Sequence, residues 1–477
     1  MNGRLYDFIA LFLASGMLTG LVGCANYGSG GGQVPDSSHY ASGVNAANRA
    51  RTDVLDALLE GRPGLSPELS GLQLAVMKQG EVIFSYAKDR VGSHNESTFP
   101  PFESRSKVRV ASISKLAVSI GIMRLVERGQ IDLDADVSQY LGFELENPNF
   151  PSEAITVRQL LSHTSSIRDS GHYWLTVGET FTDFFVAGGR YYDNARHFAD
   201  GEGQQPGAFF TYSNLNFGIA AGIIERVSGQ RFDTYMEETV FRPLGLKVGF
   251  SPCSITRIAP DLLAPTYRRN NEQGEWIPDG PWRAQVDGRT IACHVGMAPF
   301  DREQSPPDRY LDNYVPADNP TFFSPQGGLR ASAEDLAVLM KLMLGKGRVG
   351  DVQVLRPETV EDMLMPVWTY DAEAINGITD EVEIPGSPNA GLMTSYGLSV
   401  HLIDLQAWGL SENRRVLAGH LGEAYGLLGQ FWFDPRTGDG FIALITGTGD
   451  DPASFAPGSS PLYYVQEEML RWWLENF

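Results

Sequence analysis

Ser112 and Lys115 have the residue types and the spacing of a nucleophile and its base, at the start of the apolar segment 116–126. A helix that begins at Ser112 would place Lys115 one turn later on the same face. The hydroxyl would then lie at the positive end of the helix dipole, beside an amine. A serine is a weak nucleophile until a base takes its proton, and a lysine serves when burial or another cation lowers its pKa. The pattern predicts Ser112 as a catalytic nucleophile.

The same spacing recurs at Ser104 and Lys107, among polar residues and without an apolar helix behind it. Short motifs recur by accident, so context decides between the two copies. We interpret the stretch 104–107 as an exposed loop.

Tyr212 and Asn214 form a second candidate element, just before a helical pattern over 217–227 that Gly229 closes. In an extended loop, residues i and i+2 point the same way, so both side chains can face one pocket. A tyrosine can relay the serine proton, and an amide can hold a substrate carbonyl. A competing match, Tyr192 and Asn194, has no apolar helix after it.

His420 and Gly422 form the third element, between the strand-like run 415–418 and the strand 427–433. Strand alternation puts both residues on one face, and a glycine there lets a substrate lie against the strand edge. Another histidine, His294, stands beside Cys293 in a long irregular stretch. The order after Ser112 and Tyr212 favours His420 as the functional histidine.

These three elements together resemble those of the serine β-lactamase and penicillin-binding protein superfamily. The chain resembles most its class C-like branch, which includes family VIII esterases, D-amino-acid peptidases and related serine hydrolases. Two further segments are similar to family segments: Leu160–Ser166, and Gly327–Ser332 followed by Asp335 and Leu336. The resemblance spans about residues 46 to 477 and is specific for the superfamily rather than for a substrate.

The resemblance implies a role for each of five residues in an acyl-enzyme mechanism. Ser112 would attack the carbonyl, and Lys115 and Tyr212 would share the proton transfers. Asn214 would orient the substrate. The backbone N–H groups of Ser112 and Glu423 would form the oxyanion hole, whose donors stabilise a tetrahedral intermediate.

His420 and Gly422 would bind substrate, with His420 at the position where relatives carry lysine or arginine. A mostly neutral imidazole is a poorer partner for the carboxylate of a β-lactam. Esters, amides or D-amino-acid peptides, including peptidoglycan-derived peptides, are therefore the expected substrates. The alternatives are a β-lactamase, a DD-carboxypeptidase, or a penicillin-recognising sensor or cell-wall binding protein with little turnover.

The N-terminus predicts export. Arg4 precedes the apolar stretch 8–21, and Leu21–Cys24 resembles a bacterial lipobox. We expect a signal peptide over 1–23, lipid on Cys24, and a Gly- and Ser-rich flexible linker over 24–45. The alternative is an ordinary signal peptide. The expected location is the outer membrane or periplasm of a Gram-negative cell, otherwise the cell surface.

Cysteine content and charge add three expectations. Acylation of Cys24 would leave Cys253 and Cys293, which an oxidising compartment would join in a disulfide; two unpaired buried thiols are the alternative. The bridge would close a loop of about 40 residues and stabilise by about 3 to 4 kcal/mol. The net charge of −21 argues against nucleic-acid binding. No spacing of histidine and cysteine predicts a metal site, and no cofactor is expected.

The expected fold combines an α/β part with an all-α part. Both chain ends, 46–111 and 323–477, would build one antiparallel sheet flanked by helices. The middle, 112–322, would be an inserted, mainly helical domain, giving a β-lactamase/transpeptidase-like architecture. Within it, the aromatic stretch 168–210 and the Pro-rich stretch 250–322 look like insertions, which would either pack as ordinary helices and loops or line the cleft.

Overall fold

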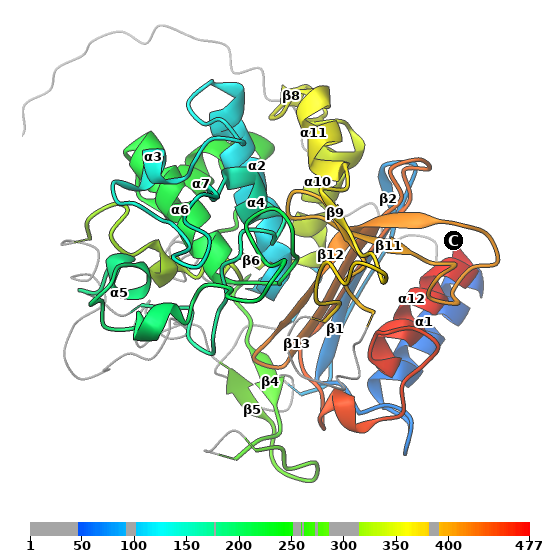
Figure 1. Ribbon diagram of the computed structural model, residues 1–477. Helices are drawn as coiled ribbons and strands as arrows, with labels where there is room; N and C mark the ends of the chain where they lie inside the picture. The colour runs from blue at the N-terminus through cyan, green and yellow to red at the C-terminus, as the bar shows by residue number, and fades with distance from the viewer. Residues whose placement is uncertain are drawn as a thin grey trace, which may run out of the picture. The chain divides into compact units, whose positions relative to one another are not determined.

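A computed structural model describes residues 46–91, 102–175, 178–250, 259, 262–271, 275–285, 314–380 and 391–477 (Figure 1). Residues Ala50–Phe477 form the larger of the two units into which the chain divides, and this unit is compact. The predicted leader, the linker, His294 and the three cysteines, Cys24, Cys253 and Cys293, lie outside the described residues. Lipid attachment, the disulfide and the domain boundaries at 111 and 322 stay predictions. Within the described ranges, every helix is too short or too polar to cross a membrane.

An eight-stranded antiparallel sheet brings together the two ends of the larger unit. Strands β1 (Gly71–Lys78) and β2 (Glu81–Asp89) form a hairpin, and β1 pairs on its other side with β14 (Gly440–Ile445). The sheet continues through β13 (Leu427–Phe433), β12 (Val416–Ala424), β11 (His401–Asp404), β10 (Ser395–Tyr396) and β9 (Trp368–Thr369).

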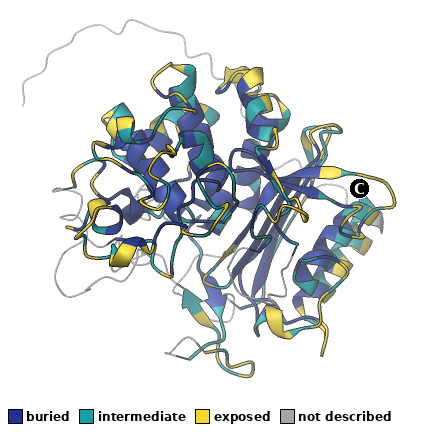
Figure 2. Ribbon diagram, in the orientation of Figure 1, coloured by how far each residue is buried: buried dark blue, intermediate teal, exposed yellow. Residues whose placement is uncertain are grey.

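Both faces of this sheet are covered, so its central strands are apolar on both sides. In β1, Leu74 and Val76 join one core with α1 (Ala46–Leu59) and α12 (Tyr464–Asn476). Met77, on the opposite face, joins the core that contains α2 (Ser114–Glu127) and α10 (Ala333–Leu344). Figure 1 shows α12 on one side of the strands and α10 on the other, and Figure 2 shows the central strands as buried.

The remaining described structure consists of helices, short strands and loops. α2 packs against α6 (Leu215–Ser228), and Gly229 ends α6 with a φ of +69°, the conformation that favours glycine at this position. Among the described residues, the other α-helices are α3 (Ser138–Leu141), α4 (Val157–Leu161), α5 (Thr182–Phe185), α7 (Phe232–Met236) and α11 (Pro357–Leu364). The same part of the chain contains three small two-stranded sheets, which pair β3 (Val108–Arg109) with β6 (Arg330–Ala331), β4 (Thr266–Arg268) with β5 (Arg283–Gln285), and β7 (Arg348–Val349) with β8 (Val352–Gln353).

The predicted fold class is confirmed: helices flank an antiparallel sheet drawn from both chain ends. One local prediction needs correction: the helix expected from Ser112 opens with a 3-10 turn, Ala111–Ile113. Near the other end of the chain, β10 and β11 are separated by a break in which Ser399 has a positive φ of +60°. The last helix starts at Tyr464.

The aromatic stretch 168–210 contains two kinds of side chain. Phe181, Phe184, Phe185 and Phe198 are buried in the core with α2 and α6, which supports the packing interpretation for these four. His172 instead lies between the rings of Trp174 and Tyr191, at centroid distances of 4.5 and 4.4 Å, and all three are only partly buried.

Candidate active site

Ser112 lies in a tight turn between β3 and α2. Ala111, directly before it, has a φ of +48°. Such a conformation costs a non-glycine residue about 1 to 3 kcal/mol and persists only where the surroundings impose it. Here the neighbouring segment imposes it: the Val110 N–H donates to the Leu329 carbonyl (2.9 Å), and the Leu329 N–H donates to Ser114 Oγ (3.0 Å).

Lys115 is fully buried, and its side-chain nitrogen lies within hydrogen-bond distance of three oxygen atoms. Nζ lies 2.9 Å from Ser112 Oγ, 2.9 Å from Asn214 Oδ1 and 3.0 Å from the Gln326 carbonyl oxygen. A buried polar group needs such partners, because an unpaired one is costly. Lys115 therefore links the serine directly to the start of α6.

Tyr212 and Asn214 come from the loop before α6, as the sequence predicted. The Tyr212 ring centroid lies 4.7 Å from Lys115 Nζ, and the Asn214 amide oxygen accepts from the same nitrogen. The structure thus brings Ser112, Lys115, Tyr212 and Asn214 together around one amine. Their catalytic roles remain predictions.

Asp169 orients this loop and was missed by the sequence analysis. Its carboxylate accepts hydrogen bonds from Ser213 Oγ (2.9 Å), Asn214 Nδ2 (2.9 Å), and the backbone N–H groups of Asn214 (3.0 Å) and Leu215 (2.9 Å). Asn214 makes no capping bond with its own side chain, so Asp169 serves the first N–H groups of α6 from outside the helix. Because the amide nitrogen of Asn214 faces Asp169, its oxygen faces Lys115.

Replacing Asp169 with asparagine is expected to lower kcat/KM for an ester substrate. An asparagine offers one acceptor oxygen and one NH2 group to a site where four donors converge. Losing charge-assisted hydrogen bonds worth about 1.5 to 3 kcal/mol corresponds to about a tenfold to hundredfold loss. Steady-state kinetics with p-nitrophenyl butyrate would measure it. The control is D193N, which changes an exposed aspartate. Equal kcat/KM in D169N and wild type would contradict the orienting role.

His420 is buried, with both ring nitrogens engaged inside the protein. Nδ1 lies 2.5 Å from the Leu421 carbonyl oxygen, which can only accept, so Nδ1 carries the proton. Nε2 therefore accepts from the Tyr396 hydroxyl at 2.7 Å. Burial, and after it the positive charge of Lys115, hold the pKa of His420 well below its usual range. The imidazole is neutral, and contact of Nε2 with a substrate would compete with its hydrogen bond to Tyr396. The substrate-binding role of His420 stays a prediction.

Gly422 is required for close packing of the backbone. A Cβ atom at this position would lie 2.4 Å from the Val110 carbonyl oxygen. The glycine therefore lets β12 approach the turn that carries Ser112, and its contact with substrate stays a prediction. Glu423 follows with an exposed side chain. An oxyanion hole formed by the N–H groups of Ser112 and Glu423 remains a prediction.

The Pro-rich insertion reaches the end of the same strand. Thr266 Oγ1 in β4 donates to the Tyr425 carbonyl oxygen (2.9 Å) in the turn between β12 and β13. Tyr425 is about half exposed and has a φ of +55°. The guanidinium of Arg109 lies 4.9 Å from its ring centroid. The described part of this insertion therefore supports the turn beyond Glu423.

The competing motif matches, Ser104 with Lys107 and Tyr192 with Asn194, have different surroundings from Ser112 and Tyr212. Lys107 is buried and forms an ion pair with Asp335 at 2.6 Å, so the interpretation of 104–107 as an exposed loop was wrong for this residue. The ion pair and hydrogen bonds of its backbone with Leu262 and Ala264 hold it inside. Tyr192 precedes a 3-10 turn whose Asp193 and Asn194 are exposed.

Comparison with known proteins identifies the family. The model of the Beta-lactamase family matches residues 53–457. The chain therefore belongs to the Beta-lactamase family, and its similarities lie in the class C-like branch.

Two relatives and one solved structure illustrate the similarity. The chain is 27% identical to Esterase EstB of Burkholderia gladioli over 246 residues, covering 49% of this chain and 58% of the relative. It is 24% identical to N-acetylmuramyl-L-alanine amidase of Bacillus subtilis over 318 residues, covering 63% and 64%. The match spans less than two thirds of either relative. A class C beta lactamase structure from Rhodobacter sphaeroides shares the fold, with a TM-score of 0.54, 16% identity, and coverage of 88% of this chain and 98% of that one.

Proposed function

We propose that this protein is a serine hydrolase that works through an acyl-enzyme on Ser112. The observation that carries the proposal is the placement of Lys115 Nζ, 2.9 Å from both Ser112 Oγ and Asn214 Oδ1. This geometry ties a buried amine to a hydroxyl in a strained turn, which is the arrangement that activates a weak nucleophile.

The proposed reaction runs in two halves. Ser112 Oγ attacks the substrate carbonyl carbon, and its proton passes to the Lys115–Tyr212 pair, in which one of the two groups is deprotonated before the attack and acts as the base. The bond to the leaving group then breaks, and that proton goes to the departing oxygen or nitrogen. In the second half a water molecule attacks the acyl carbon and gives its proton to the same pair. Ser112 recovers its proton as the acid leaves.

Uncharged esters are the substrate class that we favour. His420 is neutral and bound to Tyr396, so it offers no positive charge to a substrate carboxylate. A relative, Esterase EstB, carries ester chemistry in its name, and another relative is named as an amidase, which keeps amides and cell-wall peptides as the second class.

A substrate panel tests this proposal. The full chain in detergent is expected to hydrolyse p-nitrophenyl butyrate with a kcat/KM at least about tenfold above that for nitrocefin, because the missing charge-assisted contact is worth about 1.5 to 3 kcal/mol. D-amino-acid amides form the third arm. A preference for nitrocefin would replace the esterase proposal by the β-lactamase alternative. Labelling of Ser112 without release of acid would identify a stalled, sensor-like acyl-enzyme.

We also propose that the protein is exported and anchored by lipid on Cys24. Support comes from the segment Leu21–Cys24 and from the Gly- and Ser-rich stretch behind it. Metabolic labelling with an alkyne palmitate analogue in a bacterial host is expected to mark wild type and not C24A. Equal labelling of both proteins would contradict this assignment.

A further inference from the structure

His163 contacts three consecutive residues of the loop that carries Tyr212. Its carbonyl oxygen accepts from the Thr211 N–H (2.9 Å), and its Nδ1 accepts from the Ser213 N–H (3.0 Å). Between these two bonds, its ring stacks on Tyr212, with centroids 4.3 Å apart and planes 30° from parallel. One residue thus holds the Tyr212 ring and the backbone on both sides of it.

The histidine is in its neutral form with the proton on Nε2. A backbone N–H can only donate, so Nδ1 must offer its lone pair to Ser213. The Asn216 amide nitrogen approaches the same atom at 3.4 Å. Burial, and after it the positive charge of Lys115, holds the pKa of His163 well below its usual range. The ring therefore adds no second positive charge beside Lys115.

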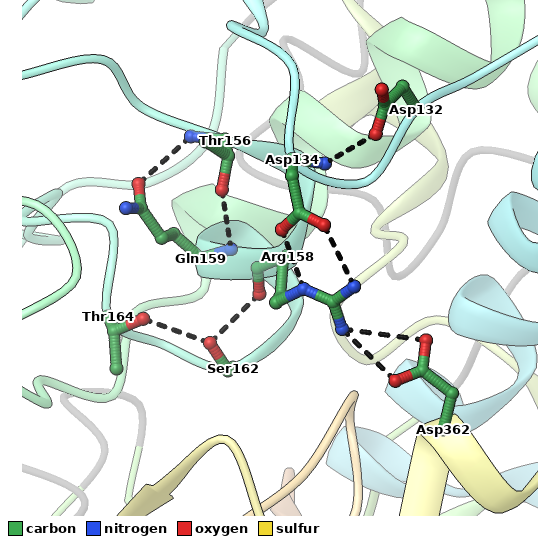
Figure 3. A network of polar contacts seen from close by, with 8 residues as sticks. All are labelled: Asp132, Asp134, Thr156, Arg158, Gln159, Ser162, Thr164 and Asp362. Atoms are coloured by element: carbon green, nitrogen blue, oxygen red, sulfur yellow. Dashed lines mark hydrogen bonds and ion pairs between the residues drawn. The ribbon is translucent and has the colours of Figure 1, made fainter.

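The backbone around His163 is held by its own network (Figure 3). His163 follows α4 with a φ of +58°, a conformation that a glycine would adopt more easily. Ser162 and Thr164 flank the histidine in the sequence. Ser162 Oγ donates to the Arg158 carbonyl oxygen (2.8 Å) and lies 2.9 Å from Thr164 Oγ1. Arg158 in turn forms ion pairs with Asp134 (2.7 Å) and Asp362 (3.2 Å). This turn keeps a histidine in a strained position where the ring meets Tyr212.

We propose that His163 is a positioning residue that fixes the Tyr212 hydroxyl for proton transfer, a role that rests on the proposed hydrolase function. The stack fixes the plane of the phenol ring. The hydrogen bonds from the Thr211 and Ser213 N–H groups fix the backbone on both sides of Tyr212, and with it the distance of the ring from Lys115. His163 itself exchanges no proton in the reaction.

A double-mutant cycle with Tyr212 tests this role. H163N retains an acceptor oxygen and tolerates the positive φ, but it lacks the ring. We expect H163N to lower kcat for p-nitrophenyl butyrate at least about tenfold, with KM changed by less than about threefold. In the Y212F background, where the hydroxyl is absent, the same change is expected to cost less than about threefold. H163F, which keeps the ring and loses the acceptor, should retain more activity than H163N.

The matched control is H197N. His197 is equally buried, and its Nδ1 lies 3.1 Å from the Arg168 carbonyl, but its ring packs edge-on against Phe184 at 4.7 Å. H197N is expected to keep kcat within about twofold of wild type.

Two results would overturn the proposal while leaving the hydrolase function intact. One is a pair of losses that multiply in the H163N/Y212F double variant, and the other is an H163N enzyme as active as wild type. If wild type turns over no substrate, the same cycle is read from the rate of fluorophosphonate labelling at Ser112. Loss of an acidic limb of the pH profile in H163N would instead make His163 a catalytic base and also overturn it.

Discussion

Replacing Ser112 with alanine is expected to lower kcat/KM for p-nitrophenyl butyrate by about 10⁴-fold or more, because the acyl-enzyme can no longer form. Ser112 Oγ lies 2.9 Å from the side-chain nitrogen of the buried Lys115. Alanine fits the turn without adding atoms, so folding should be retained. Initial rates and thermal melting of the same preparations would measure both effects.

The second serine of the recurring motif supplies the control. S104A removes a hydroxyl from the segment whose Lys107 is paired with Asp335, and it should keep wild-type rates. An S112A enzyme with more than about a hundredth of wild-type kcat/KM would contradict a nucleophilic Ser112, since loss of a covalent nucleophile costs far more than this.

Removing Lys115 and Tyr212 is expected to produce losses that do not multiply. K115A and Y212F should each lower kcat by about 10²-fold or more, and the double variant should be only slightly slower than the worse single variant. The physical reason is that both groups are expected to serve the same proton: Lys115 Nζ lies 2.9 Å from Ser112 Oγ and 4.7 Å from the Tyr212 ring centroid. When either group is removed, the remaining group can no longer pass the proton on, so removing it as well costs little more.

Y192F is the matched control for this cycle, because Tyr192 has the same sequence pattern in different surroundings. It should leave kcat unchanged. Independent roles for Lys115 and Tyr212 would appear as fully multiplicative losses. An inactive Y192F with an active Y212F would move the site to the other match.

Local patterns were sufficient to predict the elements that carry the site. The apolar run after Ser112 gives α2, and the run closed by Gly229 gives α6, since each pattern is contained within its own helix. The hairpin of β1 and β2 and the strand β13 were likewise readable from alternation and from a short turn. The Ser112, Lys115, Tyr212 and Asn214 cluster then follows from the order and context of the motifs.

Other parts of the site depend on contacts between distant segments. Gln326 contributes a backbone carbonyl to Lys115, and every residue type carries one, so no side chain marks it. Asp169 is one of many acidic residues, and only the fold shows that its carboxylate reaches the start of α6. The hydrogen bond to His420 Nε2 comes from Tyr396 in β10, a strand that is distant in sequence and pairs with β11 rather than directly with β12.

The reason for a glycine at position 422 also depends on contacts between distant segments. The sequence predicted that this position needs space beside the strand, and a Cβ atom there would lie 2.4 Å from the Val110 carbonyl oxygen. The sequence could not say whether substrate or backbone fills that room, because the answer depends on how β12 packs against the turn before Ser112.

Mass spectrometry of the acyl-enzyme is the most direct test of the central claim. Wild-type protein mixed with p-nitrophenyl butyrate and quenched in acid within milliseconds is expected to gain one butyryl group, on the peptide that contains Ser112. K115A should gain it more slowly, and S112A should not gain it. A butyryl group on the peptide with Ser104, or rapid turnover in which S112A matches wild type, would contradict an acyl-enzyme on Ser112.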